Sequence, residues 1–144
     1  MATEKTARAT WEGTLAEGSG RFSLGSGTVS EQVVTWRDRA EEGAGTSPEE
    51  LIAAALASCV LMALAGGLAR AGTPPTKLRS EARTTFDKVG EGFKMTKIEL
   101  SIRGEVEGID DEAFQQAAQG AKENCPVSQA LKDNVEVILD AALI

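Results

Sequence analysis

The pattern of apolar and polar positions divides the chain into three stretches. In the first stretch, short alternating runs are separated by glycine-rich turns, which is typical of strands that follow one another along the chain. The runs read ARATWEGTLA (residues 7–16), RFSLG (21–25) and TVSEQVVTWRDR (28–39). We therefore predict a meander or hairpin of short strands before residue 40.

A long helix is predicted in the second stretch. Leu51–Ala69 runs for nineteen residues without a charge. The SPEE sequence before it carries a helix-start signal. Ser47 would be the N-cap, Pro48 would take the first helical position, and Glu50 would close a capping box. Nineteen residues reach the length of a membrane span. Seven of them are alanine, however, which contributes little to insertion. Because a helix that is apolar on every side is buried in a soluble protein, we predict a central core helix and no membrane partner.

Strands and helices alternate in the third stretch. AGTPP ends the long helix, KLRSEARTTF and TKIELSIRGEV read as strands joined by a GEG turn, and VEVILDAALI reads as a final strand. Between the last two strands, DDEAFQQAAQGAKEN has the spacing of a helix, which PVSQALK continues after a proline. The apolar positions that carry these periods are Leu78, Ala82, Phe86, Ile98, Leu100, Ile102, Phe114, Ala117, Ala118 and Ala121.

This order of elements indicates an α+β fold in one domain over residues 1–144. One sheet can cover only one side of a helix that is apolar all round, so Leu51–Ala69 needs a second surface on its far side. The simplest source of that surface is a second copy of the chain. We therefore predict a two-fold homodimer with paired central helices.

Charge and composition restrict the possible partners and compartment. The chain has 144 residues, 15 Lys and Arg against 22 Asp and Glu, and a formal net charge of −7. No basic block is present, so we expect no nucleic-acid partner and no binding to an anionic membrane surface. The opening MATEKTARATWEGTL lacks the apolar core of a signal peptide, so we expect a cytoplasmic protein. Stable structural disulfides are rare in the cytoplasm.

Two cysteines and no histidine set the candidate chemistry. Without histidine, a typical zinc site or a Cys-His hydrolase is not expected, and no metal or cofactor site is predicted. Cys59 lies among apolar neighbours that should raise its pKa. A reactive thiolate at Cys59 would therefore need a cation that offsets this effect. The nearest candidates in sequence are Arg37 and Arg39, at the end of a predicted strand. Cys125 precedes a proline and could N-cap a helix, which would favour its thiolate. Two inert core thiols are the alternative.

The segments GTSPEELIAAALASC and AKENCPVSQAL carry a resemblance to a known family. Together with WEG near Trp11 and GIDDEAFQQAAQGAK, they make the chain resemble the OsmC/Ohr family of bacterial thiol-dependent hydroperoxide reductases, and the OsmC branch more than the Ohr branch. The likeness spans nearly the whole chain. It implies an OsmC-like fold with strands wrapping a long central helix in an intertwined homodimer.

The resemblance also implies roles for four residues. Cys59 would attack the O–O bond of an organic hydroperoxide and become a sulfenic acid, and Cys125 would condense with it to a disulfide. Arg39, or Arg37 two residues before it on the same face of a strand, would hold the Cys59 thiolate, and Glu49 would orient the guanidinium. Val60 stands where the family often has an aromatic residue. A dithiol, possibly on a lipoylated protein, would be the reductant.

A non-catalytic reading competes with the peroxidase. The same fold could serve as a redox sensor or a small-ligand-binding protein whose thiols react slowly or never. Glu49 in a first helical turn could merely complement the helix dipole, and either arginine could be a solvated strand end. Counting free thiols after addition of one equivalent of an organic hydroperoxide separates the two classes.

Overall fold

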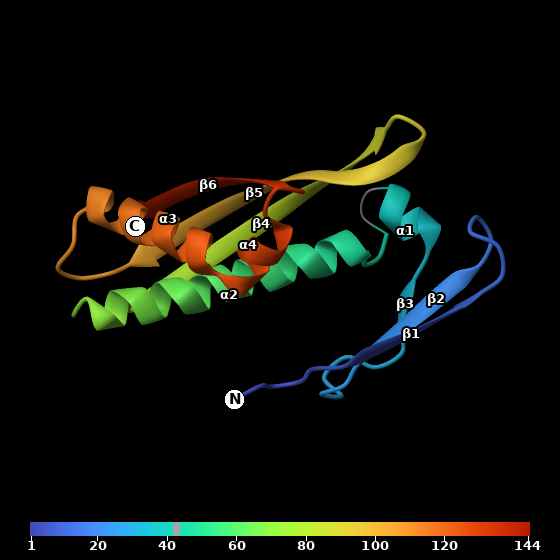
Figure 1. Cartoon of the computed structure of the whole chain (residues 1–144), viewed down its shortest axis with the longest axis horizontal. Coiled ribbons are helices and arrows are strands. Elements are labelled where there is room, and N and C mark those ends of the chain that lie inside the picture. Colours follow the sequence, from blue (N-terminus) through green and yellow to red (C-terminus); the bar gives the residue numbers. More distant parts are fainter. Residues whose placement is uncertain (42–43) are drawn as a thin grey trace. The chain divides into compact units, whose positions relative to one another are not determined.

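The computed structural model describes residues 1–41 and 44–144, which form two compact units, Met1–Pro48 and Glu49–Ile144 (Figure 1). Each unit contains a three-stranded sheet, and the described residues also form four helices. The α+β prediction is therefore confirmed. The assignment of the whole chain to a single domain stays a prediction.

The sheet of the first unit is the predicted meander. Strands β1 (Ala7–Glu12), β2 (Ser19–Leu24) and β3 (Gln32–Val34) pair antiparallel in chain order. Trp11 pairs with Gly20 across β1 and β2, and a Cβ atom at Gly20 would lie 2.8 Å from the indole ring. The indole Nε1 donates to the carbonyl of Gly13 at 3.0 Å. The WEG segment therefore has a local structural role in this sheet and its turn.

The first unit buries almost nothing by itself. All six residues of β1 are exposed, and within the described part of this unit Ser23 has the only buried side chain. The Ser23 hydroxyl accepts from the backbone N–H of Glu31 at 2.9 Å and donates to its carboxylate at 3.1 Å. Polar contacts of this kind supply little stability compared with apolar burial, so the described part of this unit has no apolar core of its own.

Helix α1 (Trp36–Ala40) occupies the place where the sequence predicts the end of a strand. Thr35 is its N-cap: the Thr35 hydroxyl accepts from the backbone N–H of Asp38 at 3.1 Å and donates to the Asp38 carboxylate at 2.8 Å. This reciprocal cap stops β3 at Val34 and starts a helix. The strand prediction for residues 28–39 is therefore wrong outside Gln32–Val34.

Helix α2 (Pro48–Arg70) begins at the predicted proline and runs without a break. It ends in a Schellman motif: the N–H of Thr73 donates to the carbonyl of Leu68 at 2.9 Å and that of Gly72 to Ala69 at 3.1 Å. Gly72 has φ = +85°, a conformation that glycine adopts without strain. The AGTPP stop signal is thereby confirmed.

One side of α2 belongs to the core of the second unit, and its other side remains apolar and uncovered. The buried side chains form one stripe: Glu49, Ala53, Leu56, Val60, Leu64 and Leu68. On the other side, Leu51 is 39% and Met62 76% exposed. The helix is long and apolar enough to cross a membrane by composition alone, but its packed stripe fits a core helix. As predicted from the sequence, its own sheet covers only one of its sides.

The sheet of the second unit contains β4 (Lys77–Val89), β5 (Gly92–Glu105) and β6 (Glu136–Leu143). β4 and β5 form a hairpin, whereas β5 and β6 run parallel. The period-two prediction holds in β5, where Ile98, Leu100 and Ile102 are buried. In β4 a register shift after Thr85 interrupts the alternation, so that Phe86 stacks on Phe93 with ring centroids 5.2 Å apart.

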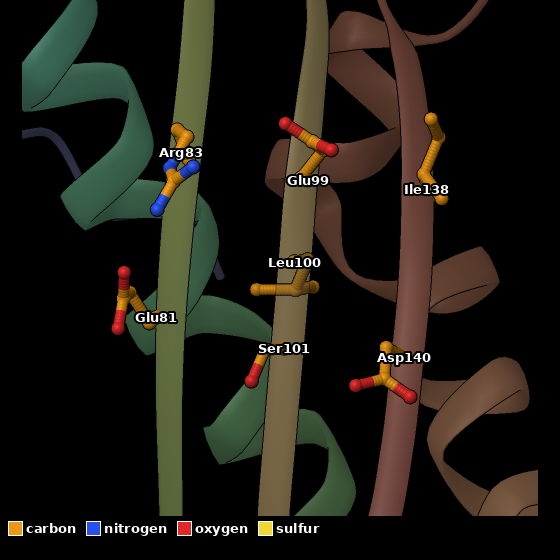
Figure 2. Close-up of a pocket in the computed structure, with 7 residues that line it drawn as sticks. All are labelled: Glu81, Arg83, Glu99, Leu100, Ser101, Ile138 and Asp140. Atoms are coloured by element: carbon orange, nitrogen blue, oxygen red, sulfur yellow. The ribbon is translucent and has the colours of Figure 1, made fainter.

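The parallel pairing of β5 and β6 requires a crossover, and two helices supply it. α3 (Asp111–Asn124) and α4 (Pro126–Leu131) lie on the same face of the sheet as α2 (Figures 1 and 2). Phe114 of α3 is completely buried, and a Cβ atom at Gly104 would lie 2.6 Å from its ring. This close approach holds α3 against β5. The crossover thereby carries the segment around residue 125 onto the layer that contains α2.

Candidate active site

The first thiol of the candidate site lies near the middle of α2. Cys59 is half-buried and packs against the core cluster beside the buried Val60. One residue before it, the Ser58 hydroxyl donates to the carbonyl of Ala54 at 2.8 Å, and two residues before it, the carbonyl of Ala57 accepts from the Ser80 hydroxyl of β4 at 3.1 Å. The thiol is therefore held on a rigid part of the helix.

The second thiol lies at the junction of α3 and α4. The backbone N–H of Cys125 donates to the carbonyl of Ala121 at 2.9 Å, which ends α3, and its carbonyl accepts from the N–H of Gln129 at 3.0 Å, which starts α4. Pro126 takes the first helical position, so the N-cap prediction is confirmed. The Cys125 side chain is fully buried and makes no cap hydrogen bond.

The two thiols meet. Cys125 and the backbone N–H of Val127 both lie close enough to Cys59 to act on its pKa, and both cysteines are free. Burial raises the pKa of the Cys59 thiol, the hydrogen bond and the charge of Cys125 raise it further, and the Val127 N–H opposes them. None of the groups that act on the Cys59 pKa is a cation that would favour the thiolate.

Sequence reasoning missed the Val127 amide, although a signal for it was present. The first N–H groups of a helix have no partner within the helix, and a proline at the first position presents the amides that follow it. The CPV sequence therefore places a backbone donor two residues after a cysteine. In the folded chain this amide lowers the pKa of Cys59, and the Cys125 side chain makes no cap hydrogen bond.

The two arginines do not lie on a strand, as the sequence analysis expected. Both belong to α1, where residues two apart point to different sides of the helix. Arg37 Nε donates to Glu41 Oε2 at 3.0 Å in an exposed pair. Arg37 is thereby engaged at the surface of the first unit, and the roles of both arginines stay predictions.

Glu49 and Cys59 share one helix but lie far apart. Glu49 is buried in the first turn of α2, only 7% exposed. Because α2 is unbroken, ten residues separate it from Cys59 by about 15 Å along the axis. The structure therefore brings Cys59 and Cys125 together but does not bring Glu49 to Cys59 within one chain.

The hollow shown in Figure 2 has no part in this site. It is lined by Glu81, Arg83, Glu99, Leu100, Ser101, Ile138 and Asp140, and it lies on the face of the sheet opposite the helices. It contains no thiol. Within residues 1–41 and 44–144, no group of His, Cys, Asp or Glu side chains has the arrangement of a metal site.

Two adjacent free thiols on a helical layer packed against a mixed sheet are the arrangement expected of a thiol-dependent redox protein, and comparison with known proteins identifies the family. The family model for OsmC-like proteins matches residues 41–140. The chain is 43% identical to the peroxiredoxin OsmC of Escherichia coli K12 over 99% of both chains. The chain belongs to the OsmC-like family, and its likeness to a peroxiredoxin over its full length confirms the prediction that it is a peroxidase.

Solved structures confirm the predicted OsmC-like fold. An organic hydroperoxide resistance protein from Elizabethkingia anophelis is similar with a TM-score of 0.78, at 26% identity and with all of both chains covered. OhrB of Bacillus subtilis is similar with a TM-score of 0.73, at 28% identity, covering 94% of this chain and 97% of OhrB.

Proposed function

We propose that this chain reduces organic hydroperoxides through a sulfenic acid on Cys59 that Cys125 resolves as a disulfide. The observation that carries the proposal is the contact of the two thiols, which come from α2 and from the α3–α4 junction. Two inert core cysteines would have no need to meet. The likeness to proteins named for organic hydroperoxide resistance supports the choice of substrate.

The proposed reaction has two steps. The Cys59 thiolate attacks one peroxide oxygen, the O–O bond breaks, and the alkoxide leaves and takes a proton to become an alcohol. The Cys59 sulfur is thereby oxidised to a sulfenic acid. In the second step the Cys125 sulfur attacks the Cys59 sulfur, the S–O bond breaks, hydroxide leaves as water, and a disulfide forms. A dithiol, such as a lipoylated protein, would then reduce the disulfide.

The cation that the Cys59 thiolate needs is assigned to Arg39, with Glu49 orienting the guanidinium through a bidentate pair. The separation of about 15 Å along α2 argues that Glu49 serves the Cys59 of a partner subunit. The uncovered apolar side of α2, with Met62 76% exposed, supports a homodimer as the active form. We place this dimer in the cytoplasm, where reductants keep both thiols free.

Free-thiol titration tests the proposal. The reduced chain should lose both thiols rapidly after one equivalent of cumene hydroperoxide. Cys59→Ser should lose turnover, whereas Cys125→Ser should consume about one equivalent and then drift to sulfinic acid, because no second thiol intercepts the sulfenic acid. A redox-inert protein of the same fold would keep both thiols. Normal turnover of Cys125→Ser with a dithiol would refute the two-cysteine mechanism.

A further inference from the structure

Ser128 carries a buried hydroxyl with no visible task. Among the described residues, its Oγ is the one buried side-chain oxygen or nitrogen that makes no hydrogen bond to another protein group. A buried hydroxyl left in this state opposes folding, so such groups are rare in proteins. The position of Ser128 in α4, three residues after Cys125, indicates what the hydroxyl could serve.

Helix geometry directs this hydroxyl towards the resolving cysteine. Cys125 is the N-cap of α4 and Ser128 is its third helical residue, and residues three apart lie on the same face of a helix. The Cα–Cβ bond of a helical residue tilts towards the helix N-terminus, so the Ser128 side chain leans towards Cys125. Cys125 makes no cap hydrogen bond in the reduced chain, so its sulfur is not committed to the backbone of α4.

Ser58 provides the contrast. It directly precedes Cys59, and its hydroxyl already donates to the carbonyl of Ala54 at 2.8 Å and to that of Ala55 at 3.2 Å. This is the usual arrangement of a serine within a helix. Of the two serines close to the thiols, only Ser128 has a hydrogen to donate without breaking an existing bond.

We propose that the Ser128 hydroxyl donates a hydrogen bond to the Cys125 sulfur when that sulfur carries negative charge in the resolving step. This inference rests on the proposed function. In that step Cys125 gives up its proton, its sulfur bonds to the Cys59 sulfur, and hydroxide leaves Cys59 and takes up the proton as water. Ser128 keeps its own proton throughout and stabilises the attacking sulfur. The same donor would stabilise Cys125 when a dithiol later displaces it from the disulfide.

The test separates the two chemical steps in full-length protein. Reduced wild type, Ser128→Ala, Ser128→Thr and the matched control Ser58→Ala are each mixed with one equivalent of cumene hydroperoxide. Samples are quenched by alkylation at intervals, and mass spectrometry counts free thiols, disulfide and sulfenic acid trapped by a diketone reagent. All four proteins should form the sulfenic acid at the wild-type rate. Disulfide formation should be about tenfold slower in Ser128→Ala, because a hydrogen bond to a charged group is lost. In Ser128→Thr and Ser58→Ala it should stay near the wild-type rate.

Stability distinguishes this role from a structural one. Because Ser128→Ala removes an unpaired buried hydroxyl, the Tm of the reduced variant should equal or exceed that of wild type. Three results would overturn the inference without affecting the first chemical step, the formation of the sulfenic acid. They are a fall in the Tm of Ser128→Ala, disulfide formation at the wild-type rate in Ser128→Ala, and disulfide formation in folded Ser128→Thr that is as slow as in Ser128→Ala. Failure of wild type to lose either thiol would overturn the proposed function itself, and the inference with it.

Discussion

The proposed sharing of the site between subunits makes a quantitative prediction for mixed dimers. Glu49 and Cys59 lie ten residues apart on the unbroken α2, which is about 15 Å along the axis and about 80° around it at 3.6 residues per turn. A single guanidinium cannot easily pair with Glu49 and also hold Cys59 across that separation. The intact site should therefore combine Cys59 of one chain with the partner subunit's Glu49.

Complementation measures this directly. Cys59→Ser and Glu49→Ala chains are refolded together in equal amounts, and hydroperoxide turnover is compared with that of each parent. Each mixed dimer then contains one site with an intact Cys59 and an intact Glu49. If chains pair at random, about half of the dimers are mixed and each has one working site, so activity should reach about a quarter of wild type.

A matched control carries the same substitutions on one chain. The double variant Cys59→Ser/Glu49→Ala is refolded with wild type, with mixed dimers isolated and confirmed by mass. A shared site leaves these isolated dimers with no complete site, whereas a site within one chain leaves them with one. Two results together would refute the shared site. They are turnover in the control dimer, and turnover in the complementing dimer that does not exceed the average of the two parent variants.

Three other outcomes follow from the same site and fold. Cys59 packs against apolar core residues, and each buried methylene of a substrate contributes about 0.8 kcal/mol to the binding free energy. Cumene hydroperoxide should therefore have a higher kcat/KM than hydrogen peroxide. Equal kcat/KM values in steady-state assays would contradict an apolar pocket. Burial and Cys125 raise the pKa of the Cys59 thiol, and the proposal assigns the opposing cation to Arg39, so Arg39→Ala should move the pH profile of Cys59 alkylation to higher pH. Arg37→Ala, which only breaks the exposed pair with Glu41, should keep the wild-type profile, and the reverse result would reassign the activating role to Arg37. In urea denaturation, Gly104→Ala should lower the free energy of unfolding by about 1–3 kcal/mol, because its Cβ meets the Phe114 ring. Gly120→Ala, whose Cβ meets nothing within 4 Å, should raise the free energy of unfolding by about 0.5–1 kcal/mol. Similar effects at both glycines would show that the Phe114 contact is not tight.

Most of the second unit could be predicted from the sequence because local patterns and tertiary packing agree there. Period two in Ile98, Leu100 and Ile102, and helical spacing through Phe114, both correspond to residues that are buried. The helix α1 was missed because the β-branched pair Val33 and Val34 suggests a strand that continues. The stronger signal was Thr35-x-x-Asp38, a capping-box sequence that ends the strand and starts a helix.

The contact between the thiols could not be derived from the residues alone. Spacing along the chain does not show whether Cys59 and Cys125 meet, and the resemblance to a family supplied that pairing. The structure provides the physical reason: β5 and β6 are parallel, so the chain must cross over the sheet, and the crossover carries Cys125 onto the same layer as α2. Nothing in the hydrophobic pattern distinguishes a parallel from an antiparallel pairing of the last strand.

Reactivity and assembly are coupled if the proposed mechanism holds. Within the second unit, burial and Cys125 favour the protonated Cys59, and the one opposing group is the neutral amide of Val127. The proposal assigns the activating cation to Arg39, which belongs to the other unit, and that unit buries little by itself. Apolar burial of that unit and of the uncovered side of α2 would then provide the stability that holds a charged group against the thiol. A chain that has not assembled would keep Cys59 as a poorly reactive thiol.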